Sequence, residues 1–178
     1  MGQTLKYEAF HLGRKVGSLT VTREVSDERT KIKVVSDFTG KLKPIDFFRY
    51  ETRSTYMDQK LIEAEGFFKS GSDLNSFITL FFSEESYYLE TSDLSTELGP
   101  DNVLSTDLFY FEEPFQIKSA IFIRSGEQLS IEKLKDEPGS YALSGPVLKI
   151  INHYKSGELS TFEWVIDDQI IAFRPIGK

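Results

Sequence analysis

What the sequence lacks already excludes several classes of protein. It contains no cysteine, so it can form no disulfide, thiolate nucleophile or cysteine-bound zinc site. Its 21 lysines and arginines are outnumbered by 28 acidic residues, and a net charge of −7 argues against wrapping a phosphate backbone. No apolar stretch approaches the roughly 20 residues of a membrane-spanning helix. We therefore expect no nucleic-acid partner and no membrane span.

Signatures of the common enzyme classes are also missing. The sequence has no G-x-S-x-G elbow, no P-loop and no G-x-G-x-x-G fingerprint. Its two histidines, His11 and His153, have no second histidine at metal-ligand spacing. We therefore predict no metal and no cofactor, assign no catalytic residue, and favour a non-enzymatic protein. An enzyme with an unrecorded site stays open, and it would use His11, His153 or Glu113.

What the sequence does have is an excess of aromatic residues. There are 15 phenylalanines, 8 tyrosines and 1 tryptophan, or 13% of 178 residues. A chain of this length is expected to form one domain, residues 1–178, that buries a core without disulfides or metal. The fold must therefore bury a large aromatic surface.

The chain alternates short β-like runs with turn clusters from end to end. Runs rich in Val, Ile, Thr, Tyr and Phe are separated by connections too short for parallel crossovers. The expected strands are residues 5–10, 16–25, 30–38, 47–57, 61–69, 76–82, 86–91, 120–124, 128–134, 140–143, 147–154, 159–166 and 170–173. We predict a mainly β fold, an antiparallel meander of about 10–12 strands that forms a closed or strongly curved barrel or half-barrel.

The stretch from Leu98 to Glu113 is the exception to this pattern. Asp101 can cap a helix, and the apolar residues that follow have helical spacing, whereas the run Phe109-Tyr110-Phe111 favours a strand. We place one short helical turn at residues 103–108 and expect at most one or two short helices in the protein.

The hairpin around Ser156-Gly157 allows two registers. A two-residue loop sets Lys149 opposite Trp164, whereas a three-residue loop sets Ile150 opposite Phe162. We favour the second, because it pairs apolar with apolar residues and Lys149 with Glu163. It predicts one buried face, made of Leu148, Ile150, Tyr154, Phe162, Trp164 and Ile166.

Doubled aromatics are the feature most relevant to function. Phe47-Phe48, Phe67-Phe68, Phe81-Phe82 and Tyr87-Tyr88 each put a ring on both faces of a strand. A sheet covered on both sides explains this, and so does an aromatic-lined cavity for an apolar ligand. An exposed patch for a partner protein is a further explanation. The wall residues predicted for a ligand cavity are Phe48, Tyr50, Phe68, Phe82, Tyr154 and Trp164.

Charged residues alternate in sign along one face of the strand that begins near Phe47. Arg49, Glu51 and Arg53 share that face, as in a solvent-facing ladder. The other interpretation is that Arg49 and Arg53 line a semi-polar lumen and bind the carboxylate or phosphate headgroup of a ligand.

Motifs along nearly the whole chain resemble a family of small secreted bacterial β-proteins of unknown function, of the Bacteroidetes type. The resemblance lies in Tyr7-Glu8-Ala9-Phe10, Phe48-Arg49-Tyr50, Tyr110-Phe111-Glu112-Glu113-Pro114, Ile121-Phe122 and Tyr141 to Pro146. The chain is also similar, more weakly, to the periplasmic lipoprotein-carrier half-barrels, whose curved antiparallel sheet holds acyl chains. These motifs carry no catalytic residue.

The resemblance implies an exported protein, in the periplasm or secreted. The start of the sequence fits this, because Met1-Gly2 is followed at once by strand-like alternation, as if it stood ahead of a mature N-terminus whose signal peptide had been removed. A native cytoplasmic start is the alternative.

Together these observations predict an uncharacterised bacterial envelope protein that binds a lipid or another apolar or amphipathic small molecule in an aromatic-lined concavity. The alternative is a structural or protein-interaction module of the cell envelope. The sequence identifies neither the ligand nor the oligomeric state.

Overall fold

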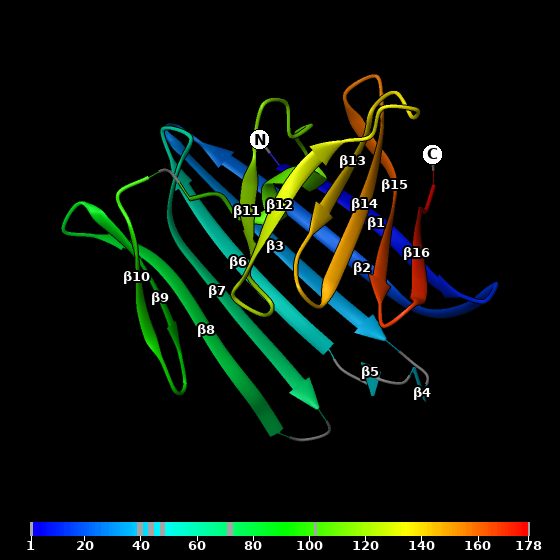
Figure 1. Ribbon diagram of the computed structural model, residues 1–178, viewed down its shortest axis with the longest axis horizontal. Helices are drawn as coiled ribbons and strands as arrows, with labels where there is room; N and C mark the ends of the chain where they lie inside the picture. Colours follow the sequence, from blue (N-terminus) through cyan, green and yellow to red (C-terminus); the bar gives the residue numbers. More distant parts are fainter. Residues whose placement is uncertain are drawn as a thin grey trace.

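The computed structural model (Figure 1) describes residues 2–38, 41–42, 45–46, 49–70, 73–101 and 103–177. For residues 41–42, 45–46, 68–70 and 73–77 it describes the backbone alone. The predicted wall residue Phe48 lies outside the described residues, and so does the side chain of Phe68.

Sixteen strands and one 3₁₀ helix make up the described chain. In chain order they are β1 Gly2–His11, β2 Arg14–Ser26, β3 Arg29–Phe38, β4 Lys41–Leu42, β5 Ile45–Asp46, β6 Arg49–Met57, β7 Lys60–Ser70, β8 Asp73–Ser83, β9 Ser86–Thr91, β10 Ser95–Gly99, η1 Thr106–Tyr110, β11 Ser119–Phe122, β12 Glu127–Lys133, β13 Ser140–Ser144, β14 Leu148–Lys155, β15 Glu158–Ile166 and β16 Gln169–Pro175.

Fourteen of these strands form one antiparallel sheet, and β4 and β5 form a separate pair. The order across the large sheet is β10-β9-β8-β7-β6-β3-β2-β1-β16-β15-β14-β13-β12-β11. The prediction of a mainly β meander is confirmed, but the predicted 10–12 strands were too few. The sheet curls so that β11 to β14 lie across its other half (Figure 1), yet β10 and β11 remain its two end strands. Hydrogen bonds do not close it into a barrel.

Strand alternation sets which side chains point inward. Along β6, Tyr50, Thr52, Ser54 and Tyr56 are buried, while the residues between them are exposed or half-buried. We call the face that carries these four residues the inner face.

Tight turns join the neighbouring strands. Both central residues have positive φ at Asp58-Gln59, Glu84-Glu85 and Ser156-Gly157, as the hairpin turns that match strand twist require.

The β14–β15 hairpin departs from both predicted registers. It has the two-residue loop, with Lys155 opposite Glu158, but the register shifts between His153 and Tyr154, so that Ile150 lies opposite Trp164. A β-bulge, which inserts one residue into one strand, causes such a shift. The favoured register was therefore wrong by two residues. Since side chains alternate with a period of two, the predicted buried face survives, with Trp164 1% exposed and Phe162 1% exposed.

The chain between β10 and β11 fills the concave side of the sheet. Its helix η1 spans Thr106–Tyr110 and is capped by Ser105, whose side chain accepts a hydrogen bond from the Asp107 N–H. The predicted helical turn exists, but it begins three residues later than expected and uses Ser105 rather than Asp101. Two tyrosines hold this segment. The Tyr154 hydroxyl donates to the Phe109 carbonyl at 2.6 Å, and the Tyr141 hydroxyl donates to Glu113 at 2.7 Å. We call residues 101 and 103–118 the plug.

Packing brings the two ends of the sheet together where hydrogen bonding does not. The β11–β12 turn lies on the inner face of β7 and β9. A Cβ added to Gly66 on β7 would lie 2.7 Å from the Ile123 carbonyl oxygen, and one added to Gly126 would lie 3.1 Å from the Leu89 side chain. Glycine at position 66 thus allows backbone to pack directly on backbone.

This closure predicts the effect of filling Gly66. We expect Gly66→Val to destabilise the fold by about 1–3 kcal/mol, because the new side chain overpacks the contact with Ile123. Urea unfolding measures the change. Gly2→Val is the matched control, since a Cβ there meets only the Arg23 carbonyl, at 3.8 Å, and it registers any gain from β propensity alone. Equal stabilities of the two variants would show that the turn does not pack on β7 in solution.

Candidate functional site

A polar cluster lies inside the otherwise apolar interior. The Asp107 carboxylate, on η1, accepts hydrogen bonds from the Thr52 hydroxyl at 2.6 Å and the Ser54 hydroxyl at 3.1 Å, both from β6. The Ser105 N–H donates to the Tyr56 hydroxyl at 3.2 Å. Asp107 is only 5% exposed. The cluster therefore joins the plug to the sheet wall, and Thr52, Ser54, Tyr56, Ser105 and Asp107 form what we call the interior polar cluster.

Burial changes the acidity of this carboxyl group. Desolvation raises the pKa of Asp107 from 3.8 to about 6, although the hydrogen bonds from Thr52, Ser54 and Ser105 lower it. The neighbouring phenols respond in the same direction, since burial and the Asp107 charge both raise the pKa of Tyr56. The interior thus favours the uncharged forms of its polar groups.

Aromatic rings surround this cluster. Trp164 contacts Tyr50 with ring centroids 5.8 Å apart, and Phe162 stacks on Phe173 at 4.2 Å. The Arg124 guanidinium, in the β11–β12 turn, lies 5.3 Å from the Tyr50 ring centroid and 5.7 Å from that of Trp164. Burial lowers the pKa of Arg124 to about 10, against an opposing effect of Tyr50. A cation held over two rings in this way is a stable cation–π arrangement.

Side chains fill the aromatic interior in the part of the chain that the structure describes. The void between η1 and the aromatic wall, lined by residues that include Phe109, Phe122 and Trp164, measures about 10 Å³. Such a space holds at most one water molecule. The aromatic wall is therefore packed against the plug.

The structure brings together three of the predicted wall residues. Tyr50, Tyr154 and Trp164 are 2%, 7% and 1% exposed and belong to one core. Phe82 is half-buried at its margin, where its ring contacts Tyr87 at 4.9 Å and lies under the Lys60 ammonium.

The two predicted headgroup residues lie on the opposite face. The side chain of Arg49 is 60% exposed and pairs with Asp37, and that of Arg53 is 56% exposed and pairs with Glu51. They form the solvent-facing ladder, and because strand neighbours point opposite ways, neither reaches the interior with Tyr50. The doubled aromatics divide likewise, with Phe81 stacked on Tyr88 at 5.6 Å on the outer face.

A pocket opens where the two end strands of the sheet approach each other. It measures about 200 Å³. Its lining residues come from β10, the start of the plug, β11 and β12, namely Leu98, Asp101, Val103, Leu104, Ser119, Ala120, Ile121 and Gln128. We call it the seam pocket. Ala120 and Ile121 belong to the core, and Val103 and Leu104 pack against it, so apolar side chains lie beneath the pocket, whereas most of the surface that it exposes is polar. Asp101, Ser119 and Gln128 supply polar groups, and Gln128 donates to the Ser119 hydroxyl at 3.2 Å.

Sequence reasoning missed both the interior polar cluster and the seam pocket. A signal for the cluster exists in β6, where Thr52 and Ser54 stand between Tyr50 and Tyr56 on one face. Hydroxyls on an aromatic face need a buried partner. The seam pocket has no such signal, because it depends on how far the sheet curls.

Neither metal ligands nor a membrane helix stand out in the described part of the chain. No group of three or more His, Asp or Glu residues there is arranged to hold a metal ion. No helix there has the length and apolar composition needed to cross a membrane.

The raised pKa of Asp107 predicts a pH-dependent stability. When the pKa of a carboxyl group is higher in the folded than in the unfolded state, the unfolded chain releases the proton first. The folded protein therefore loses stability as pH rises from about 4 to about 6. The difference between 3.8 and about 6 corresponds to roughly 3 kcal/mol at full ionisation. We expect Asp107→Asn to remove this loss. The free energy of unfolding of the variant should therefore increase, relative to that of the natural protein, as pH rises. Urea unfolding across this pH range measures both.

Asp136→Asn is the control, because Asp136 is exposed and its carboxylate remains hydrated in both states. Parallel stability curves for Asp107→Asn and the natural protein would contradict the predicted burial of a titrating carboxyl.

Comparison with known proteins supports the fold. The structure is similar to the crystal structure of a β-barrel-like protein of domain of unknown function DUF1849 from Brucella abortus, with a TM-score of 0.56. The two chains share 10% identity over 97% of this chain and 95% of the other. At that identity the likeness concerns the fold alone. No curated protein sequence matches the chain.

Sequence comparison gives the family. Residues 7–169 match the model of a domain of unknown function, DUF6134. The match spans the sheet from β1 to the start of β16, together with the plug and the seam pocket. The chain therefore belongs to the DUF6134 family.

Proposed function

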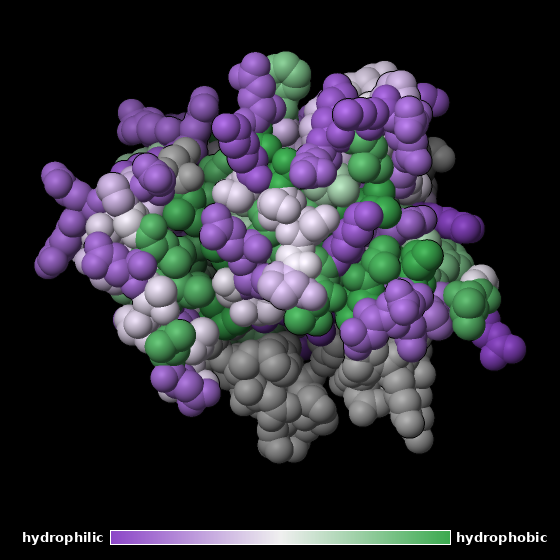
Figure 2. Space-filling model, in the orientation of Figure 1, coloured by the Kyte–Doolittle hydropathy of each residue, from purple (hydrophilic) through white to green (hydrophobic). Residues whose placement is uncertain are grey.

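We propose that this protein is a non-enzymatic binding protein that holds the apolar part of an amphipathic molecule in the seam pocket. The observation that carries the proposal is the pocket itself, in which the apolar Val103, Leu104, Ala120 and Ile121 lie beside the polar Asp101, Ser119 and Gln128. Pockets for small molecules combine an apolar lining with a few placed polar groups in this way. Figure 2 shows apolar side chains on the surface of this part of the molecule, left of centre.

The volume of the pocket limits the size of the ligand that it can enclose. A volume of about 200 Å³ is below the roughly 300–1,000 Å³ of sites that enclose a whole drug-sized ligand. The seam pocket fits the end of an acyl or similar chain, with the polar end of the molecule outside. In this proposal Tyr50, Tyr154 and Trp164 belong to the packed core rather than to the pocket lining, and Phe82 lies at the margin of that core.

Exclusion of catalysis is part of the proposal, and three side chains support it. His11 is at the surface and bonds the Ile170 carbonyl. His153 bonds the Ser140 hydroxyl at 2.9 Å, and Glu113 accepts from Tyr141 at 2.7 Å, a contact that anchors the plug. None of the three lines the seam pocket.

An envelope location completes the proposal. The motifs shared with secreted bacterial β-proteins support export, and the curved antiparallel sheet supports a relation to lipoprotein carriers. A protein in that compartment meets amphipathic molecules constantly.

The second candidate function is a protein-interaction module, and the free edge at β10 favours it. The edge is bordered by Leu94, 64% exposed, and Leu98, 36% exposed. Exposed strand edges are templates for pairing with another chain.

Blocking the seam pocket tests the first function. We expect Ser119→Trp to abolish binding of a dansyl-labelled fatty acid, measured by fluorescence titration, because the indole would occupy the pocket. Ser125→Trp, an exposed position in the same hairpin, should bind as the natural protein does. Native mass spectrometry of protein purified from its own cell envelope should detect a co-purifying lipid. A stable dimer with no bound lipid and no fatty-acid binding would instead support the interaction module.

A further inference from the structure

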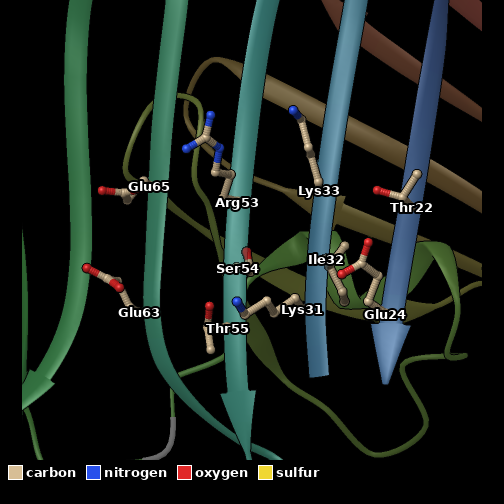
Figure 3. A pocket seen from close by; sticks show the side chains of 10 residues that line it. All are labelled: Thr22, Glu24, Lys31, Ile32, Lys33, Arg53, Ser54, Thr55, Glu63 and Glu65. Atoms are coloured by element: carbon tan, nitrogen blue, oxygen red, sulfur yellow. The ribbon is translucent and has the colours of Figure 1, made fainter. Parts of the chain in front are cut away.

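The outer face of the sheet carries a second hollow, on the opposite side of the sheet from the plug. It lies across β2, β3, β6 and β7 and measures about 250 Å³. Figure 3 shows its charged side chains standing out from the four strands, with η1 behind the sheet. The register between β6 and β7 shifts at Thr55/Tyr56. A bulge of this kind bends the strand locally and helps explain why an outer sheet surface is hollowed here.

Cations are concentrated on the two middle strands of this hollow. Lys33 lies directly opposite Arg53, a like-charge pair that destabilises a sheet unless something compensates. The compensation is a single carboxylate. The Lys33 ammonium lies 3.0 Å from Glu51 Oε1, and the Arg53 guanidinium lies 2.6 Å from the same oxygen.

The titration of Glu51 reflects this sharing. Burial alone would raise the pKa of Glu51, but the hydrogen bonds and charges of Lys33 and Arg53 lower it. Two cations and one anion leave an excess positive charge on the middle strands. Lys31, also on β3, makes no ion pair within 4 Å with the described residues and adds to that excess.

Carboxylates flank the cations on both sides. Glu24 on β2 lies opposite Lys31, whereas on β7 Glu65 lies opposite Arg53 and Glu63 opposite Thr55. In the part of the chain that the structure describes, none of these three flanking glutamates forms an ion pair within 4 Å. The hollow is therefore a positive strip with negative borders.

From this arrangement we propose that the outer hollow binds a short peptide with free termini, its carboxylate over Lys31 and the Lys33–Arg53 pair and its ammonium against Glu63 and Glu65. The spacing fits. Neighbouring strands are about 4.8 Å apart, so groups on β3 or β6 and on β7 are separated by roughly 5–10 Å. Two or three extended residues span about 7–10 Å. A hollow of 250 Å³ is too small for a folded partner, which buries roughly 800 Å² of each surface.

Binding of tri-alanine tests the proposal, followed by ¹⁵N-resolved amide shifts and by calorimetry. We expect shifts confined to the outer hollow, and loss of binding when the peptide is N-acetylated or C-amidated. Lys31→Gln and Glu63→Gln should each weaken binding about tenfold, as expected for one charge-assisted contact. Both residues are exposed and lack ion pairs within 4 Å in the described structure, so both variants should fold normally.

A double-mutant cycle assigns the two ends of the peptide. Lys31→Gln should no longer matter for the C-amidated peptide, and Glu63→Gln should no longer matter for the N-acetylated one. Lys118→Gln, at the end of the plug, and Glu132→Gln, on β12, are both at exposed positions outside the outer hollow; they are the controls and should leave affinity unchanged.

Three outcomes would overturn the proposal. They are an absence of shifts at millimolar tri-alanine, shifts that map to the seam pocket, and binding of O-phosphoethanolamine without binding of tri-alanine. Failure here is distinguishable from failure of the seam-pocket function, because Ser119→Trp leaves the outer hollow intact.

Discussion

The whole structure depends on one constraint. A sheet that curls without closing must bury its concave face against something, because two of its edges stay open. Fourteen strands run from β10 to β11 without a hydrogen bond between these ends. The chain meets the constraint with its own plug, which follows β10 and packs in the concavity. The aromatic excess follows from this arrangement, since large rings fill the space between a curved wall and an irregular segment better than small aliphatic side chains do.

The plug also explains why a carboxyl group is buried in an aromatic core. Apolar contacts are non-directional, so they alone would not fix one position of the plug against an apolar wall. The Thr52 and Ser54 hydroxyls both donate hydrogen bonds to the Asp107 carboxylate. They therefore favour the one position of the plug that brings this carboxylate within their reach. Burying Asp107 is costly, as its raised pKa shows. Hydrogen-bonded polar groups in a core can fix a unique arrangement at the expense of stability, and we interpret the interior polar cluster in this way.

Much of the fold could be predicted from the sequence, because strand alternation and turns depend on residues that are close together in the chain. Alternation along β6 and β14 identifies which residues face inward, and the turns lie where short polar clusters interrupt the runs. The hairpin at Ser156-Gly157 shows the limit. Its inward face was predicted correctly, whereas its register was not, because a bulge adds a residue without changing the pattern of apolar positions.

The site was far less predictable, since it depends on contacts between segments distant in sequence. Asp107 and Thr52 are 55 residues apart, and Tyr154 and Phe109 are 45 apart. The doubled aromatics divide between the two faces of the sheet, with Tyr87 buried on the inner face and Tyr88 half-buried on the outer one. That the plug packs against the inner face follows only from the path of the chain between β10 and β11.

The two surfaces that we propose for binding lie where the sheet is incomplete or bent. In the described part of the chain, the plug packs against the aromatic interior and leaves a void of only about 10 Å³. At the seam, by contrast, β11 has a neighbouring strand on one side only, apart from a single bridge to Ser105. The seam pocket therefore opens between the two end strands. The outer hollow arises similarly, where a register shift bends β7 beside β6. Hydrogen bonds between β10 and β11 would close the sheet and remove the seam pocket, whereas the outer hollow would remain.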